Sequence, residues 1–284
     1  MNFDTSSRRY AVDQMMVGLC WAAVALAAIP LVAVLYYVTS QGIHRFDLNF
    51  FTHVPAPVGV ASGGMANSLV GTIELVLIAS VVGIPVGILA GIYLAEFGKA
   101  GKFAWAVRFT ADVLSGVPSI VTGIAAYTLI VRPMHHFSAW AGGVALGTMM
   151  IPMITRTTEE LVKLVPRSVR ESALALGIPE WKTILSVVVT TARNGILMGV
   201  LLSLSRIAGE TAPLLFTAFN NNFWSASPNQ PTASLTVQIF TYAISPFDDW
   251  HDQAWTGALT LLLLVVGVNL LARIFVKRTG RAVG

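Results

Sequence analysis

The longest polar connection in this chain lies between two apolar runs and reads TRTTEELVKLVPRSVRESALALGIPEWKTILSVVVTTARN, Thr155 to Asn194. Its helical pattern is interrupted twice. Pro166 is typical of the start of a helix, Gly177 of the left-handed residue that follows a helix end, and Pro179 of the next helix start. The stretch therefore predicts two short helices joined by a tight turn. Composition alone also fits an ordinary charged loop that lies on lipid headgroups.

The composition of the chain is that of a membrane protein. Its 284 residues are 55% hydrophobic and only 11% charged, and the mean hydropathy is +0.71. A soluble core of this size cannot bury so much apolar surface. Because about 20 residues cross the hydrocarbon layer, the apolar runs predict an all-α protein with six spans. These lie at 15–38, 68–95, 107–131, 140–155, 195–219 and 255–276. The fourth is short and rich in glycine, which also fits a helix buried among other helices.

Six spans place both termini on one side of the membrane, and the basic residues indicate which side. Of the 18 lysines and arginines, Arg45 and Arg132 lie in the opposite loops and Arg206 lies within a span. The remaining basic residues all lie on one face, so we expect that face and both termini to be cytoplasmic. This topology explains the pI of 9.4 without a nucleic acid partner. The basic residues on this predicted cytoplasmic face are Arg8, Arg9, Lys99, Lys102, Arg108, Arg156, Lys163, Arg167, Arg170, Lys182, Arg193, Arg273, Lys277, Arg278 and Arg281.

We expect a single transmembrane domain over residues 1–284. The helix at 15–38 is too long for a signal sequence and is expected to be retained, in front of a core at 68–276. The connection at 156–193 would then face the cytoplasm. Cys20 is the only cysteine, so no internal disulfide forms. The acidic turn at 248–252 lacks a recognised ligand spacing, so no metal site is predicted.

Within the polar connection, ESALALG at 171–177 resembles the EAA loop of the membrane subunits of ABC importers. Ser172 replaces the first alanine of that pattern, and its closing proline is absent at Thr190. Four blocks in order, VGTIELVLIASVVGIPVGILAGIYLAEF, SGVPSIVTG, RTTEELVKLVPRSVRESALALGIPEWKTI and SRIAGETAPLLF, resemble the PstA-type permease subunits of phosphate ABC transporters. A fifth stretch, ASLTVQIF, carries Thr236 where that family usually has proline.

The resemblance implies a type I ABC importer permease in the inner membrane of a bacterium. Its implied partners are a homologous permease, two ATPase subunits and a periplasmic phosphate-binding protein. The sequence has no G-x-x-x-x-G-K-[ST] loop, so ATP and magnesium would bind to the partners, and the chain itself is expected to be neither an enzyme nor a cofactor protein. The residues implied to couple this chain to the ATPase are Arg170, Glu171, Ser172, Ala173 and Gly177.

The block SRIAGETAPLLF places two opposite charges in an apolar run. A lone arginine within a span costs at least about 2.5 to 3.5 kcal/mol, so Arg206 must face protein, a counter-charge or a watery path. Glu210 at i+4 can supply the counter-charge along the same helix face, and Gly209 and Pro213 interrupt that helix. Because a guanidinium matches a phosphate oxygen pair, we predict that Arg206 and Glu210 line the substrate path. The alternative is a neutralised pair that joins two helices.

Other polar or flexible positions in the spans lead to weaker expectations. Gly116, Pro118 and Gly123 predict a helix that bends or packs closely, which suits a moving gate and simple packing equally well. Asp112 is expected to form an ion pair with Arg108, four residues earlier. Glu74 would repel phosphate on the path, so a structural pairing or a protonated, hydrogen-bonded role is favoured.

Three rival functions would also fit parts of this sequence. The nearest is an ABC permease for another oxyanion, such as phosphonate, sulfate or molybdate. A secondary transporter would not need an exposed docking loop and usually has paired repeats, which the sequence lacks. An intramembrane enzyme would need a nucleophile or metal motif such as H-E-x-x-H, and none is present.

Overall fold

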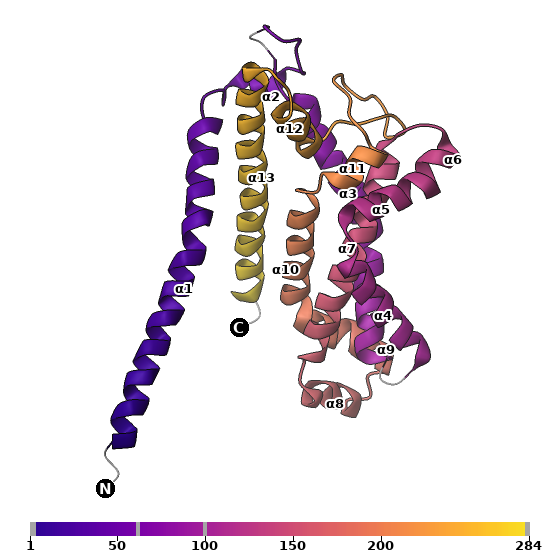
Figure 1. Cartoon of the computed structure of the whole chain (residues 1–284). Helices are drawn as coiled ribbons and strands as arrows, with labels where there is room; N and C mark the ends of the chain where they lie inside the picture. Colours follow the sequence, from indigo (N-terminus) through magenta and orange to yellow (C-terminus); the bar gives the residue numbers. More distant parts are fainter. Residues whose placement is uncertain (1–3, 61–62, 99–100, 282–284) are drawn as a thin grey trace.

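The computed structural model of this chain describes residues 4–60, 63–98 and 101–281, and all the regular elements in these segments are helices (Figure 1). The long helices are α1 (Asp4–Gly42), α3 (Ala66–Glu96), α7 (Ala139–Lys163) and α13 (Asp248–Arg281), together with the continuous run of α9 (Glu180–Lys182), η2 (Thr183–Val188) and α10 (Val189–Ile207). The shorter ones are α2 (Leu48–Thr52), α4 (Lys102–Gly116), α5 (Ser119–Ala126), η1 (Tyr127–Val131), α6 (Arg132–Met134), α8 (Arg167–Ala175), α11 (Ala212–Thr217) and α12 (Leu235–Ala243).

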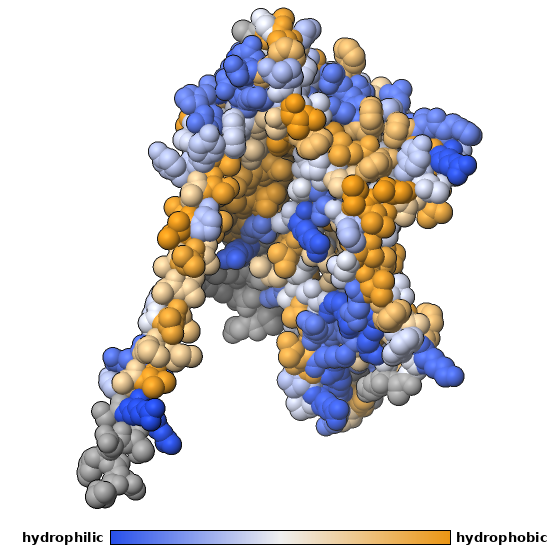
Figure 2. Space-filling view, in the orientation of Figure 1, coloured by the Kyte–Doolittle hydropathy of each residue, from blue (hydrophilic) through white to orange (hydrophobic). Residues whose placement is uncertain are grey.

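The fold is that of an integral membrane protein. Four helical stretches among the described residues are long and apolar enough to cross a bilayer, and α4 with α5–α6 makes a fifth if that bent pair counts as one span. Hydrophobic surface predominates in the middle of the molecule, with some hydrophilic residues among it, and hydrophilic surface gathers toward the two ends (Figure 2). The predicted count of six is not confirmed. The missing span is the one expected at 140–155, which lies in α7.

Helix α7 is less apolar because protein surrounds it. It packs against α3 over most of its length and also contacts α10 and α4. Gly83, Gly87 and Gly91 of α3 recur every four residues and let the two backbones approach closely. A Cβ atom added to Gly87 would lie 2.7 Å from Ile154 Cβ. Since its neighbours are helices, α7 tolerates glycine and threonine that a lipid-facing span would replace with larger apolar residues.

Helix α1 stands apart from the other helices for most of its length (Figure 1). None of its apolar window is buried. It contacts α13 near the end at Gly42, where Tyr37 and Trp255 pack edge to face with ring centroids 5.0 Å apart. The first turn of α1 and the last described turns of α13 point toward the end of the molecule that carries α8 (Figure 1). Their assignment to the cytoplasm stays a prediction.

Two predicted spans have different boundaries in the structure. The expected helix at 107–131 is broken between α4 and α5, which meet at an angle of 107°. The span expected at 195–219 instead runs over 180–207, so the residues after Pro179 belong to a long helix and not to a short one. The reason is local: no glycine or proline separates Pro179 from Asn194, and the apolar run ILSVVV continues the helix.

Candidate functional site

The turn between α8 and α9 has the geometry that the sequence predicts. Helix α8 begins after Pro166, and Gly177 follows its end with a φ of +75°. The Ile178 amide donates to the Ala173 carbonyl at 3.3 Å, and the Gly177 amide donates to Leu174 at 2.9 Å. These two bonds form a Schellman motif, which satisfies the last carbonyls of the helix. The predicted helix start, the left-handed glycine and the second helix start are therefore confirmed.

The predicted coupling residues differ in accessibility. Glu171, Ser172 and Gly177 are exposed, whereas Ala173 is only 5% exposed. Ala173 therefore packs inside this chain, and its part in coupling stays a prediction. The exposed apolar residues of this region were missed: Leu176 is 82% exposed and Trp181 is 63% exposed. Leu176 lies outside the spans and Trp181 lies in the first turn of the 180–207 span, and exposed large apolar side chains at such a place are a signal for a partner surface.

Arg170 is also turned inward. Its Nη2 donates to Glu96 Oε1 at 2.7 Å and to the Val162 carbonyl at 2.9 Å, and its Nη1 donates to the Val165 carbonyl. The Arg170 side chain is 20% exposed and that of Glu96 is 10% exposed. Arg170 thus ties α8 to the ends of α3 and α7. The same residues border a cleft of about 550 Å³ lined by Ala95, Glu96, Lys163, Arg167, Arg170 and Glu171.

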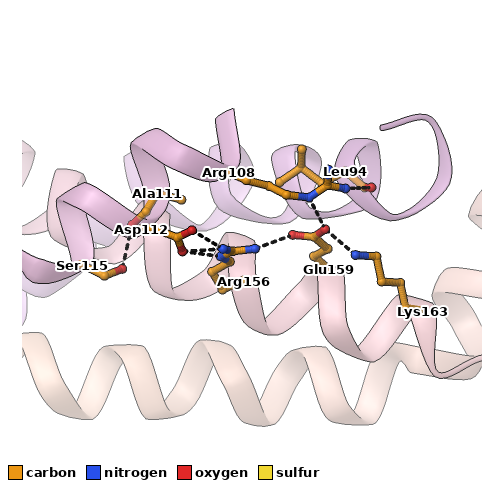
Figure 3. Close-up of polar contacts among 8 residues, drawn as sticks. All are labelled: Leu94, Arg108, Ala111, Asp112, Ser115, Arg156, Glu159 and Lys163. Carbon is orange, nitrogen blue, oxygen red and sulfur yellow. Dashed lines mark hydrogen bonds and ion pairs between the residues drawn. The ribbon is translucent and has the colours of Figure 1, made fainter. Parts of the chain in front are cut away.

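A buried carboxylate lies where α3, α4 and α7 meet (Figure 3). The Glu159 side chain is 2% exposed. It accepts hydrogen bonds from Arg108 Nε at 2.7 Å, Lys163 Nζ at 2.6 Å and Arg156 Nη1 at 3.2 Å. Burial opposes ionisation of this carboxyl, but the hydrogen bonds from Lys163 and Arg108 outweigh it and hold the Glu159 pKa below its ordinary value. The network holds α4 against α7.

The expected pair of Arg108 with Asp112 is wrong. Both residues reach across to α7 instead: Asp112 accepts from Arg156, and Arg108 bonds to Glu159 and to the Leu94 carbonyl at 2.8 Å (Figure 3). The block RTTEELVK does place Arg156, Glu159 and Lys163 on one helix face. Their partners on α4 lie 44 and 51 residues away in the chain, and no local spacing signals such contacts.

Arg206 and Glu210 come together, but not on one helix. Helix α10 ends at Ile207, and Glu210 lies in the link before α11. Arg206 Nε is 4.0 Å from Glu210 Oε1, which is a loose ion pair. Arg206 Nη1 also lies 3.3 Å from Met153 Sδ of α7. The Arg206 side chain is 52% exposed and that of Glu210 is 18% exposed, so the guanidinium is open to a ligand or partner.

Of the predicted gate residues, Gly123 contacts the helix that follows this interruption. Gly116 ends α4 and Pro118 precedes α5, at the 107° bend. A Cβ atom on Gly123 would lie 2.8 Å from the Cα of Pro213, in the first turn of α11. Helix α5 therefore meets the start of α11 where Gly123 contacts Pro213, and Pro213 lies three residues after Glu210 in the sequence. Pro213 interrupts the helix as predicted, and it fits the first turn of α11 because the amide groups there have no partner within the helix.

Two roles were expected for Glu74, a structural pairing or a protonated, hydrogen-bonded carboxyl group. Glu74 lies in α3 and is partly buried. Within the described part of the chain no hydrogen bond or ion pair reaches its carboxyl group. A structural pairing inside this chain is therefore not found.

Residues 83–281 match the family described as binding-protein-dependent transport system inner membrane components. The phosphate transport system permease protein PstA of Yersinia pestis is 46% identical over 265 residues, which cover 93% of this chain and 87% of that protein. PstA of Haemophilus influenzae is 42% identical and covers 93% of both chains. A chain of the MetNI methionine ABC transporter in inward-facing conformations aligns at a TM-score of 0.57 and 19% identity, over 77% of this chain and 93% of that chain. That likeness concerns the fold alone.

Proposed function

Because this chain belongs to the family of binding-protein-dependent transport system inner membrane components, we propose that it is the transmembrane permease subunit of an ATP-driven phosphate importer. The observation that carries the proposal is the 46% identity with a phosphate permease over 93% of the chain. The whole chain would act as one permease domain, and the membrane would be the inner membrane of a bacterium.

The proposed complex contains a homologous permease, two ATPase subunits and a periplasmic phosphate-binding protein. In this complex ATP and magnesium bind to the ATPase subunits, since the sequence has no phosphate loop. The exposed side of α8 and its turn would dock on an ATPase subunit. Glu171 supplies charge there, and the exposed Leu176 and Trp181 supply apolar area. Arg170 and Ala173 would act from inside, by fixing the position of α8.

Arg206 is the proposed phosphate contact of the path. Its exposed guanidinium can donate two parallel hydrogen bonds to an oxyanion. Glu210 lies at 4.0 Å, near the outer limit of an ion pair. A loosely held counter-charge leaves Arg206 free to bind the anion and competes with the anion afterwards, so phosphate is released. The bend at Gly116 and Pro118 and the contact of Gly123 with α11 would allow this region to open and close.

The test is phosphate uptake by proteoliposomes that contain the assembled complex and its binding protein. We expect Arg206→Gln to assemble normally and to abolish uptake, and Arg206→Lys to keep part of it because an ammonium lacks the planar fork. Arg132→Gln is the matched control: it removes an exposed arginine of α6 and is expected to transport normally. If Arg206→Gln fails to assemble, the pair has a structural role. If it transports normally, Arg206 is not on the path.

Two further measurements distinguish the rival functions. Uptake that does not require ATP would indicate a secondary transporter. Competition with sulfate, molybdate or phosphonate that equals competition with phosphate would indicate a permease for another oxyanion. The proposal requires uptake that depends on ATP and on phosphate, and ATP hydrolysis that phosphate-loaded binding protein stimulates.

A further inference from the structure

The link that carries Glu210 is held from the side by a residue of α12. Thr236 lies in the first turn of that helix and is 6% exposed. Its Oγ1 donates a hydrogen bond of 2.9 Å to the backbone carbonyl of Glu210. The Ser234 hydroxyl lies 3.2 Å from Thr236 Oγ1. A buried backbone carbonyl in a link between helices needs a donor from elsewhere, and here the donor lies 26 residues further along the chain.

The donor itself is firmly placed. The neighbouring Leu235 amide donates to Thr72 Oγ1 of α3 at 2.9 Å, and that hydroxyl donates in turn to the Ser68 carbonyl at 2.7 Å. Ser234 caps α12 by accepting from the Val237 amide at 3.3 Å. The first turn of α12 is therefore anchored to α3. Through the hydrogen bond from Thr236, this anchored turn fixes the position of the Glu210 backbone in the link between α10 and α11.

We propose that Thr236 is a positioning residue for substrate transfer, which acts by holding Glu210 at the distance from Arg206 that allows phosphate to exchange. This inference rests on the proposed function of Arg206. The two charges are 4.0 Å apart, where a small displacement of the Glu210 backbone decides whether they interact. The PstA-type permeases that this chain resembles usually have proline at this position. Because proline has no hydroxyl, the hydrogen bond from Thr236 to the Glu210 carbonyl is a property of this chain's own sequence.

A set of matched variants tests the role of the hydroxyl. Thr236→Val keeps the shape of the side chain and removes the donor, whereas Thr236→Ser keeps the donor. Thr241→Val, in the same helix, removes a hydroxyl that donates to the Val237 carbonyl of its own helix. Phosphate uptake per assembled complex is expected to fall about five-fold in Thr236→Val, as for the loss of one hydrogen bond. Thr236→Ser and Thr241→Val should stay near the wild-type rate.

The decisive measurement is a double-mutant cycle with Glu210→Gln. If Thr236 acts through Glu210, Thr236→Val costs nothing further once the carboxylate is gone. Equal losses in both backgrounds, or an equal loss in Thr241→Val, would overturn the proposal. If Thr236→Val does not assemble, Thr236→Ala replaces it in the cycle, and failure of both assigns Thr236 to folding. If Arg206→Gln takes up phosphate normally, the proposed path itself is rejected. If Arg206→Gln is inactive but the losses of Thr236→Val and Glu210→Gln add, only the role of Thr236 is rejected.

Discussion

Replacing Glu159 with glutamine is expected to loosen the junction of α3, α4 and α7. The substitution keeps the size of the side chain but removes its charge, while three cationic groups remain around it, at 2.6, 2.7 and 3.2 Å. The side chain is 2% exposed, so water cannot take the place of the carboxylate. Breaking a buried ion pair on one side costs about 3 to 5 kcal/mol.

The structure favours the lower end of that range. Arg156 keeps Asp112 as a partner, Arg108 keeps the Leu94 carbonyl, and the Lys163 side chain is 52% exposed and can be hydrated. A loss of about 3 kcal/mol corresponds to roughly 6 °C in Tm for a chain of this size. The measurement is thermal unfolding of the purified complex, followed by the loss of its peak in size-exclusion chromatography. Glu160→Gln is the control, since Glu160 is the exposed neighbour in the same helix.

The pH dependence of this difference has a definite sign. Because the pKa of Glu159 in the folded chain lies below its ordinary value of 4.5, its stabilisation is fully present above that value and is lost as the pH falls through the folded pKa. The Tm gap between wild type and Glu159→Gln should therefore stay constant from about pH 8 to about pH 5 and narrow only in more acidic solution. Equal Tm values for Glu159→Gln and Glu160→Gln near neutral pH would refute the reasoning.

Two substitutions of glycine test the coupling turn and the helix core. Gly177→Val forces a β-branched residue into a φ of +75°, so phosphate-stimulated ATPase activity and phosphate uptake should fall together. The control Gly101→Val, at a φ of −98°, should change neither activity. Normal activity of Gly177→Val would contradict the proposed docking. Gly91→Val puts a Cβ atom 2.5 Å from Thr158 Cβ and should lower the yield of assembled complex by overpacking, at about 1 to 3 kcal/mol. Gly18→Val, where no atom lies within 4 Å, should assemble normally; equal yields for both would mean that α3 and α7 separate easily.

Local sequence was sufficient for features that depend on neighbouring residues. The turn at Gly177 was predictable because a left-handed residue after a helix selects glycine. The start of α11 at Pro213 and the break near Gly116 and Pro118 were predictable because proline lacks an amide donor and restricts the residue before it. The membrane class followed from composition, since apolar area in such excess has no other place.

The sequence by itself determined that this protein is helical, belongs in a membrane and has a tight turn at Gly177, because these properties follow from hydropathy and from steric limits of single residues. Tertiary structure alone decided which charges meet. Arg108 and Asp112 could pair on one helix, yet both bond to α7 because that helix brings a buried carboxylate and a second guanidinium within reach. Burial also turned Arg170 and Ala173 inward. Such choices depend on how closely α3, α4 and α7 approach, and the sequence encodes that distance only through glycines whose partners lie far along the chain.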